Sequence, residues 1–296
     1  MATLKEKRTC GQRCEDFGRF VWNSDEGKLF GRTPARWVYI SLYYAAFYVI
    51  MTGLFALAIW TLMYTLDPYA PDYQDRLRSP GVMVWPDVYN EEDLELAYNI
   101  SKGSKSWTKM SKCLTDFLIP YNDSAQWSSS KMHACHSGHY YMQPQFQDPG
   151  HCKKFKWSCY FNLTTLGDCS GLEDPTFGYN GTSPCVIIKM NRIINFLPNN
   201  GTGQAPYVNC TILDGGSNVN GMDYYPANGT FDLSYFPYYG KQAQPAYLNP
   251  LVAVKIHLTN KLWAKLQCRV VAENIAYQNF YEPYEGKVIF NISASR

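Results

Sequence analysis

The stretch WVYISLYYAAFYVIMTGLFALAIWTLMYTL, residues 37–66, contains no charged side chain and decides how the rest of the chain is interpreted. About 20 consecutive apolar residues are enough for a helix to cross a lipid bilayer, so this run can span one with some tilt. A buried core helix rarely stays uncharged for so long, and a cleavable signal peptide is shorter and begins closer to the N-terminus. The stretch therefore predicts one transmembrane helix.

Charges on the two sides of this run differ in sign. Residues 1–36 carry eight Lys or Arg side chains, whereas Asp67, Asp72 and Asp75 follow the run closely. Short segments rich in Lys and Arg stay in the cytosol, so we expect a type II protein with a single span. The predicted divisions are a cytoplasmic tail at 1–36, the span at 37–66, a membrane-proximal stalk at 67–89 and an ectodomain at 90–296.

Glycosylation sequons and cysteines agree with that orientation. Every Asn-x-Ser/Thr sequon follows the apolar run, where N-linked glycans are added: Asn99, Asn122, Asn162, Asn180, Asn200, Asn209, Asn228 and Asn291. Eight of the ten cysteines follow it too, an even number suited to disulfide bonds in an oxidising compartment: Cys113, Cys135, Cys152, Cys159, Cys169, Cys185, Cys210 and Cys268. Cys10 and Cys14 lie in the tail, where we expect free thiols, with palmitoylation as the alternative.

Beyond the span, the sequence predicts an extended stalk, one helix and then strands. Prolines punctuate the stalk. Apolar residues recur at helical spacing up to Tyr121, so we expect an amphipathic helix that Ser104 or Ser106 caps and Pro120 ends. Alternating or β-branched runs then predict strands at 186–196, 250–258, 266–270 and 286–293.

The last of these segments illustrates the expected β architecture. Val288, Phe290 and Ile292 would face inward, which turns the sequon residue Asn291 outward. Short strands separated by clusters of Gly, Pro and Asn favour an all-β sandwich for the ectodomain.

Two patterns suggest chemistry, and each has a simpler interpretation. Gly167–Gly171 has the outline of a nucleophile elbow around Cys169, but a disulfide is the expected fate of this cysteine, with Cys185 as a natural partner. A second cluster has the ingredients of a zinc site, although its spacing fits no firm metal pattern and solvated loop histidines are favoured: His133, Cys135, His136, His139, His151 and Cys152.

Several enzyme classes are disfavoured by what the sequence lacks. No Asp-x-Asp motif occurs, which argues against a metal-dependent glycosyltransferase, and Gly240-Lys241 lacks the upstream glycine of a P-loop. The acidic run 91–95 is most simply a solvated face. The net charge of +2 gives no signal for nucleic acid. We therefore expect no catalytic residues, no metal and no cofactor.

The segment YFPYYGK, residues 235–241, concentrates aromatic side chains around one proline. In the strand predicted just before it, alternation places Tyr235 in the core and turns Phe236 the other way. Pro237 would then break the strand, so that Tyr238 and Tyr239 splay outward. Exposed aromatics without convergent polar groups predict a protein interface rather than a ligand site.

A second aromatic pattern lies inside the apolar run. Tyr44, Tyr48 and Thr52 recur every four residues on one helix face, and we expect Gly53, Leu57 and Trp60 to occupy a neighbouring strip. Hydroxyl groups at that depth require hydrogen-bond partners, and glycine permits a close approach between helices. The pattern predicts a partner helix in the membrane.

Several motifs together resemble the beta subunits of potassium-transporting P-type pumps, the sodium/potassium and gastric proton/potassium ATPases. They run from FVWNSDEGKLFGRT, YYAAFY and YQDR to CSGLEDPTFGY, PCVIIKMNRIINF, YFPYYGK and PLVAVK. TCGQ, LYYAAFYVIMTGLFALAIW, DYQDRLRSPGV and PYEGK are most similar to the proton/potassium kind, which is therefore favoured. PYNDS and PLVAVK also resemble sodium-pump subunits.

The resemblance implies a non-catalytic role at the plasma membrane. Such a beta subunit joins a catalytic alpha subunit, assists its folding, export and stability, and modulates its potassium affinity. The ectodomain would be an immunoglobulin-like β-sandwich with one amphipathic helix. From another functional class, a type II adhesion or lectin-like cell-surface glycoprotein remains the alternative.

The resemblance also implies roles for individual residues. Tyr44 and Tyr48, with Gly53 and Trp60, would contact an alpha transmembrane helix. An extracellular alpha loop would meet Phe236, Tyr238, Tyr239, Gly240 and Lys241. The family's disulfides correspond to Cys135–Cys159, Cys169–Cys185 and Cys210–Cys268.

Two features depart from the family pattern. Cys113 and Cys152 are additional to the six paired cysteines, and we hypothesise a fourth bridge between them. Phe20 stands where proton/potassium relatives carry the tyrosine of an internalisation signal, so this chain departs from that signal.

Overall fold

The computed structural model describes residues 10–67, 69–90, 93–101, 105–144, 155–259 and 263–295. The chain divides into an N-terminal unit, Met1–Leu66, and a C-terminal unit, Asp67–Arg296. Five residues discussed above lie outside the described residues: Glu91, Glu92, Ser104, His151 and Cys152.

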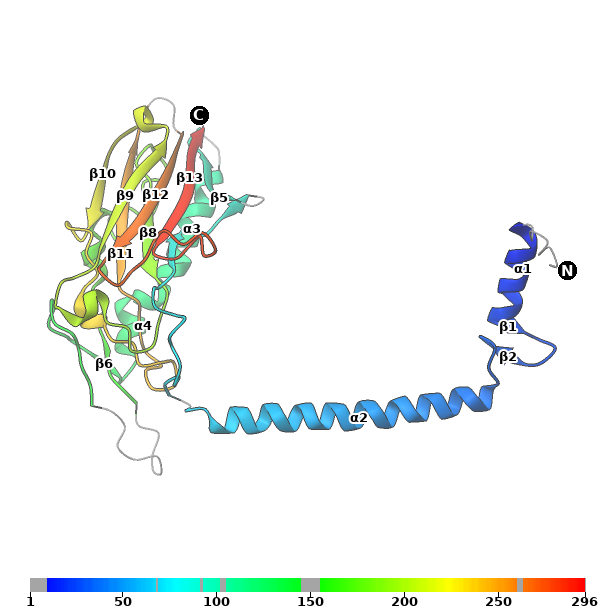
Figure 1. The fold of residues 1–296 in the computed structure, drawn as a ribbon. Coiled ribbons are helices and arrows are strands. Elements are labelled where there is room, and N and C mark those ends of the chain that lie inside the picture. Colours follow the sequence, from blue (N-terminus) through cyan, green and yellow to red (C-terminus); the bar gives the residue numbers. More distant parts are fainter. Residues whose placement is uncertain are drawn as a thin grey trace. The chain divides into compact units, whose positions relative to one another are not determined.

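The N-terminal unit consists of two helices joined by a small hairpin (Figure 1). Helix α1 is Cys10–Val21, strands β1 (Trp22–Asn23) and β2 (Lys28–Leu29) pair antiparallel, and helix α2 is Pro34–Thr65. Helix α2 begins earlier than the predicted span because proline is well suited to a first helical turn. Its 32 residues give a length of about 48 Å.

No residue of α2 is buried within the chain. Its most apolar window has a mean hydropathy of 2.0, and among the described residues α2 alone is long and apolar enough to cross a membrane. By length and composition, the helix fits a single-pass membrane protein.

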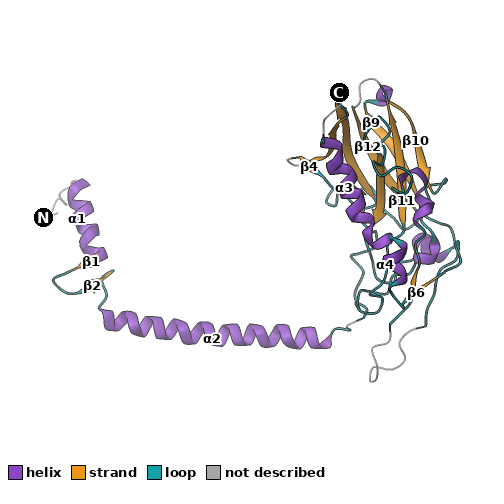
Figure 2. Ribbon diagram, turned by 180° about the vertical axis from the view of Figure 1, so that it is seen from behind, coloured by secondary structure: helices purple, strands orange, loops and turns teal. Residues whose placement is uncertain are grey.

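Two larger sheets form the framework of the C-terminal unit (Figures 1 and 2). The four-stranded sheet has the order β10-β11-β8-β3, with all neighbours antiparallel. Its strands are β3 (Val82–Trp85), β8 (Cys185–Met190), β10 (Val219–Tyr225) and β11 (Leu251–Leu258). The five-stranded sheet has the order β4-β5-β13-β12-β9, in which β5 and β13 are parallel. Its strands are β4 (Tyr89–Asn90), β5 (Asp93–Asn99), β9 (Tyr207–Asp214), β12 (Trp263–Val271) and β13 (Lys287–Ser295).

Shorter elements complete the C-terminal unit. Strands β6 (Met132–His133) and β7 (Ser158–Cys159) form a two-stranded parallel sheet. The helices are α3 (Ser106–Leu118), α4 (Asp123–Trp127) and the 3-10 turns η1 (Ile119–Tyr121), η2 (Leu163–Cys169), η3 (Pro198–Gly201), η4 (Gly216–Asn218) and η5 (Leu233–Tyr235). One hydrophobic core includes buried residues from both larger sheets and from α3.

Local patterns predicted several of these elements well. In β13, Val288, Phe290 and Ile292 are buried, as their alternation predicted. The predicted amphipathic helix is α3 followed by η1, and it buries Met110 and Leu114. Its N-cap residue is Lys105 rather than either predicted serine.

Two predicted strands differ from the structure. The run 186–196 forms only the short strand β8, because the chain turns away before Asn195, whose φ of 59° is left-handed. In β11, Leu251 and Ala253 are buried along with the alternating set. The strand lies between β8 and β10 and also contacts η2, so polar side chains are not required at each second position.

The stretch expected to form the stalk also contributes to the sheets. Residues 82–85 form β3, which pairs with β8, and the side chains of Val82 and Val84 are buried. Residues 82–85 therefore belong to a sheet, although the sequence placed them in an extended membrane-proximal stalk. The reason is a strand partner about a hundred residues later, which local composition does not reveal.

Candidate partner interface

The backbone turns sharply before the aromatic segment, which we define as residues 235–241. The side chain of Asp232 accepts a hydrogen bond from the backbone N–H of Ser234, and this starts the turn η5. The N–H of Phe236 then donates to the carbonyl oxygen of Leu233. A turn therefore replaces the predicted strand, and the inward-outward alternation ends before the segment begins.

This turn reverses the expected orientation of two aromatics. Phe236 is only 6% exposed and packs edge-to-face on Phe196, whereas Tyr238 is 8% exposed and packs against Tyr247 with ring centres 4.5 Å apart. The carbonyl of Tyr238 accepts from the N–H of Asn195 at 2.8 Å. The prediction that these two side chains splay outward is therefore wrong, because both fill space inside the C-terminal unit.

Tyr235 was expected in the core, and it is partly buried against it. Its ring packs on Phe161, and its hydroxyl donates to the carbonyl of Tyr160 at 3.0 Å. Burial raises the pKa of Tyr235 well above its ordinary value. This residue joins the aromatic segment to the interior.

Arg192, which lies outside the segment, stabilises the packed pair of Tyr238 and Tyr247. The guanidinium of Arg192 lies 5.5 Å from the ring centre of Tyr238 and 5.1 Å from that of Tyr247. Its Nε donates to Oδ1 of Asn249, whose Nδ2 donates to the carbonyl of Met190 at 2.6 Å. Burial raises the pKa of Tyr247, and the charge of Arg192 opposes that rise.

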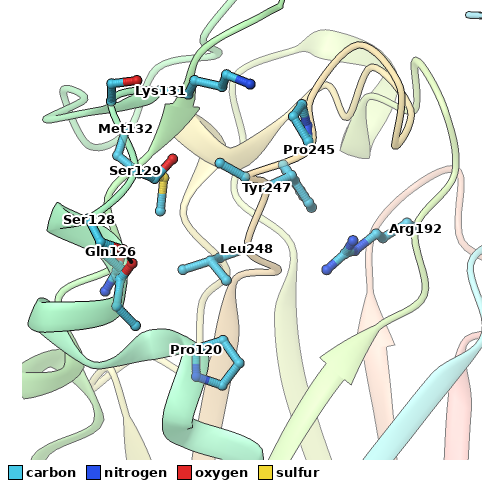
Figure 3. Close-up of a pocket in the computed structure, with 13 residues that line it drawn as sticks. Pro120, Gln126, Ser128, Ser129, Lys131, Met132, Arg192, Pro245, Tyr247 and Leu248 are labelled. Atoms are coloured by element: carbon cyan, nitrogen blue, oxygen red, sulfur yellow. Dashed lines mark hydrogen bonds between the residues drawn. The ribbon is translucent and has the colours of Figure 1, made fainter.

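A shallow groove borders this arginine (Figure 3). It has a volume of about 680 Å³, and Ser128, Lys131 and Met132 lie opposite Arg192 and Tyr247. The groove offers cationic groups next to aromatic and aliphatic ones, but the described residues here include no nucleophile paired with a base.

The second half of the aromatic segment is held by a buried lysine. The ammonium of Lys156 lies 3.8 Å from the ring centre of Tyr239 and donates to the carbonyl of Pro144 at 2.8 Å. Lys156 is 6% exposed, and burial lowers its pKa. The hydroxyl of Tyr239 accepts from the N–H of Gln143 at 2.8 Å, so this half-buried tyrosine is also fixed from inside.

The segment ends with the buried Gly240 and the exposed Lys241. Gly240 has a φ of 90°, and an added Cβ would lie 3.1 Å from the carbonyl oxygen of Tyr69 and 3.2 Å from Cδ1 of Ile194. Glycine is therefore required both by the backbone conformation and by close packing. Lys241 is exposed, so it is the residue of the segment that is most open to a partner.

On α2, by contrast, the predicted contact residues are exposed, and the rings that they contact belong to the same helix. Tyr44 and Tyr48 are 51% and 62% exposed, and their rings stack with centres 6.2 Å apart. Trp60 is 63% exposed and stacks on Tyr64. Around Gly53, the position of an added Cβ has no atom within 4 Å.

The two predicted strips on α2 are not neighbours. Each residue of an α-helix turns by about 100°, so Gly53 lies about 180° from Tyr44 and about 140° from Tyr48. Trp60 falls on the Gly53 side, about 160° from Tyr44. A single straight helix packed on the tyrosines therefore does not also cover Gly53.

Comparison of the sequence with known proteins shows the family to which the chain belongs. The chain matches the family described as sodium / potassium ATPase beta chain over residues 7–290. The chain belongs to this family.

Full-length relatives agree with the assignment. Potassium-transporting ATPase subunit beta of Homo sapiens is 50% identical over 300 residues, and the Rattus norvegicus protein of that name is 49% identical over 303. Sodium/potassium-transporting ATPase subunit beta-2 of Mus musculus is 41% identical over 300 residues. Each comparison covers 100% of both chains.

This beta chain family member contains the three disulfides that the resemblance implied. They join Cys135 to Cys159, Cys169 to Cys185, and Cys210 to Cys268. Cys169 is therefore not a free nucleophile. Cys210 and Cys268 face each other directly on β9 and β12.

The remaining cysteines lie apart from these bridges. Cys113 on α3 forms no disulfide with any described residue, and Cys152, its hypothesised partner, lies outside the described residues. Cys10 and Cys14 are exposed free thiols. Within the described part of the chain, no group of three or more His, Cys, Asp or Glu side chains could hold a metal ion.

The predicted sequons fall into two sets in this beta chain. Asn99, Asn209 and Asn291 lie on strands of the five-stranded sheet, where alternation with buried neighbours turns all three to its outer face. The others are exposed in turns and loops: Asn122, Asn162, Asn180, Asn200 and Asn228.

Sequence reasoning missed four residues that contact the aromatic segment or its partner ring, namely Arg192, Lys156, Tyr247 and Gln244. Gln244 accepts from the N–H of Tyr239 and donates to the carbonyl of Trp157. Gln244 and Tyr247 lie in the loop that follows the segment, whereas Lys156 and Arg192 come from two other loops, so no single local pattern marks all four.

Proposed function

We propose that this chain is the non-catalytic accessory (beta) subunit of a potassium-counter-transporting P-type cation pump. The observation that carries the proposal is full-length similarity to ATPase beta subunits. The structure supports it with an apolar helix, α2, that buries no residue within its own chain. In this role the chain assists the folding, export and stability of a catalytic alpha subunit, on which the ATPase site lies, and modulates its potassium affinity.

We favour a proton/potassium pump over a sodium/potassium pump. The potassium-transporting relatives are 48–50% identical to the chain, whereas the sodium/potassium beta-2 relatives are 40–41% identical. Both kinds match over the full chain, so the difference is not one of coverage.

We also propose a type II orientation in the plasma membrane, with residues 1–36 in the cytosol and those from Asp67 onward outside. All eight sequons and all three disulfides follow α2, which supports this orientation. The two larger sheets with one shared core support an immunoglobulin-like sandwich. N-linked glycans on the exposed sequons and lipid around α2 complete the expected environment.

In the proposed complex, Tyr44 and Tyr48 contact one alpha transmembrane helix. Gly53 and Trp60 then contact a different helix or lipid, because they occupy the opposite face of α2. In the aromatic segment, Lys241 and the edge of Tyr239 meet the alpha subunit, while Phe236 and Tyr238 support them from inside.

Co-expression tests this function directly. The full chain would be expressed with each candidate catalytic subunit and purified in mild detergent, and potassium-stimulated ATPase activity would be measured with and without sodium. We expect an ATPase of the proton/potassium kind to copurify and to hydrolyse ATP without sodium. If no ATPase copurifies and the chain instead mediates adhesion between cells, the adhesion or lectin-like alternative replaces this proposal.

A further inference from the structure

The three most exposed large apolar side chains in the described part of the C-terminal unit lie in two segments. Tyr73 is 87% exposed, Phe280 is 92% exposed and Tyr281 is 88% exposed, and Leu77 in the first segment is 65% exposed. We define these four residues as the apolar rim. Single exposed apolar residues are common, but a group of this kind marks an interaction surface.

Backbone and side-chain hydrogen bonds tie the two segments together. The N–H of Ala276 donates to Oγ of Ser79 at 2.9 Å, and the N–H of Gly286 donates to the carbonyl of Pro80 at 3.0 Å. A groove of about 740 Å³ is lined by Leu77 from one segment and by Ala276 from the other. The two segments that carry the rim are therefore joined at their bases, although Ser79 and Ala276 are 197 positions apart in the sequence.

The loop that carries the two aromatics is internally braced. Nδ2 of Asn279 donates to Oε2 of Glu285 at 2.7 Å, and Oδ1 of Asn279 accepts from the N–H of Tyr281 at 3.0 Å. The rings of Phe280 and Tyr281 meet edge-to-face with centres 5.7 Å apart. Exposure of these large apolar side chains to water is unfavourable, and a bound partner would remove that exposure. Because the loop is already braced, it loses little conformational entropy on binding.

Charge distinguishes a protein partner from a lipid surface. Residues 69–80 and 275–286, the segments that carry the rim, have four acidic and two basic side chains, a net of two negative charges. Phospholipid surfaces are neutral or anionic, and acidic side chains beside the rim do not favour their approach. Aromatic residues surrounded by charged groups are typical of protein interfaces, and the acidic excess suits a partner with Lys or Arg.

The position of the rim along the chain fits the same partner. Tyr73 follows the end of α2 by eight residues, which can span at most about 29 Å. A protein that packs on α2 and extends past its C-terminal end can therefore also contact this segment.

We propose that the apolar rim docks a basic, partly apolar extracellular segment of the same catalytic subunit, at a surface separate from the aromatic segment. This inference rests on the proposed function, which supplies the partner. It assigns a role to the segments 69–80 and 275–286 that is independent of residues 235–241.

Site-specific photocrosslinking of the full-length complex in membranes tests the proposal. The photoreactive residue p-benzoylphenylalanine would replace Phe280 in one variant and Tyr281 in another. Trp127, which is 75% exposed on α4, provides a matched aromatic control, and Tyr48 provides a reference position on α2. We expect crosslinks to the catalytic subunit from positions 280, 281 and 48, and none from position 127.

The result at position 48 distinguishes failure of the rim proposal from failure of the proposed function. If position 48 crosslinks to the catalytic subunit while 280 and 281 crosslink only to lipid, or to nothing, the rim proposal is wrong and the proposed function stands. If position 48 also gives no crosslink and no ATPase copurifies, the proposed function fails and takes the rim proposal with it.

Truncation of the rim gives a second measurement. The double variant Phe280→Ala with Tyr281→Ala should fold normally, because both side chains are in solvent. It should weaken association with the catalytic subunit about tenfold or more, whereas Trp127→Ala should not. Glu282→Gln should make the remaining association less sensitive to salt, and unchanged affinity in the double variant would overturn the proposal.

Discussion

Helix α2 and the aromatic segment are both rich in tyrosine, yet their side chains find partners in opposite ways. On α2, Tyr44 and Tyr48 touch only their own helix, and no residue is buried. In the aromatic segment, Phe236 and Tyr238 are enclosed by residues of several loops. The side chains of α2 therefore lack contacts with other elements of the chain, whereas the side chains of the aromatic segment are packed against other parts of the same chain. Aromatic residues alone do not distinguish a partner surface from an interior.

The largest effect that separates the two regions is expected from Phe236→Ala. Truncating a buried phenylalanine typically costs about 3–5 kcal/mol of folding free energy, a large share of the stability of a domain. Thermal unfolding of the full chain in detergent, followed by tryptophan fluorescence, should show this loss. Tyr44→Ala should leave the same transition unchanged.

The exposed Lys241→Ala provides the matched control within the segment, with an expected change of at most about 0.5 kcal/mol. If Phe236→Ala kept the wild-type unfolding transition and lost only partner association, the segment would behave like α2 and the contrast would disappear.

Substitution of Gly240 in the aromatic segment and of Gly53 on α2 should give effects of intermediate size that again differ between the two regions. Gly240→Ala forces a side chain into a left-handed conformation and toward the carbonyl of Tyr69, so it should cost about 1–3 kcal/mol of folding stability. Gly53→Ala meets no atom of the chain and should not lower that stability. The alanine should instead weaken association with the catalytic subunit if a helix packs closely there.

Unfolding transitions and copurification yields of the two glycine variants would be measured side by side. If the catalytic subunit copurified equally with Gly53→Ala and with wild type, this face of α2 would contact lipid rather than a helix. The tyrosines, which lie on the opposite face, would then provide the contact with the catalytic subunit.

The extent to which sequence predicted these regions follows from how local their interactions are. Helix α2 and strand β13 were predicted because hydropathy and alternation act over a few residues. Strand β3 was missed because its partner β8 is distant in sequence. The aromatic segment was misinterpreted because one side chain, Asp232, starts a turn where alternation suggested a strand. The opposite positions of Tyr44 and Gly53, however, follow from helical geometry alone.

Hydroxyl deletion on α2 should give a smaller effect. Tyr44→Phe with Tyr48→Phe keeps the rings and removes only the polar groups that need partners inside a membrane. Hydrogen bonds between membrane helices contribute about 0.6–2 kcal/mol, so association with the catalytic subunit should weaken modestly while the ectodomain still folds. Copurification at increasing detergent concentration would measure this change.

The control for that pair is Tyr64→Phe near the end of α2, where water can satisfy the hydroxyl. Equal yields from the control and from the double variant would show that the Tyr44 and Tyr48 hydroxyls lack partners in the complex as well.

The smallest effect is expected at Tyr179, a buried tyrosine of the C-terminal unit whose hydroxyl, unlike those of Tyr235 and Tyr239, forms no hydrogen bond with a described residue. Its side chain is fully buried, and its hydroxyl has no hydrogen-bond partner within the described part of the chain. Burial raises the pKa of Tyr179 well above its ordinary value. Removing such a hydroxyl should not destabilise the fold, and it should stabilise it by up to about 1 kcal/mol at neutral pH.

The dependence on pH gives Tyr179→Phe a second readout. Because the folded state holds this proton more tightly than the unfolded state, stability is fully present below a pH of about 10 and falls as pH rises above that value. Tyr179→Phe should make this alkaline decline less steep, whereas Lys241→Ala should not. A lower unfolding temperature at neutral pH would show that the hydroxyl has a partner after all. Tyr179 would then resemble the satisfied tyrosines of the aromatic segment rather than the open ones of α2.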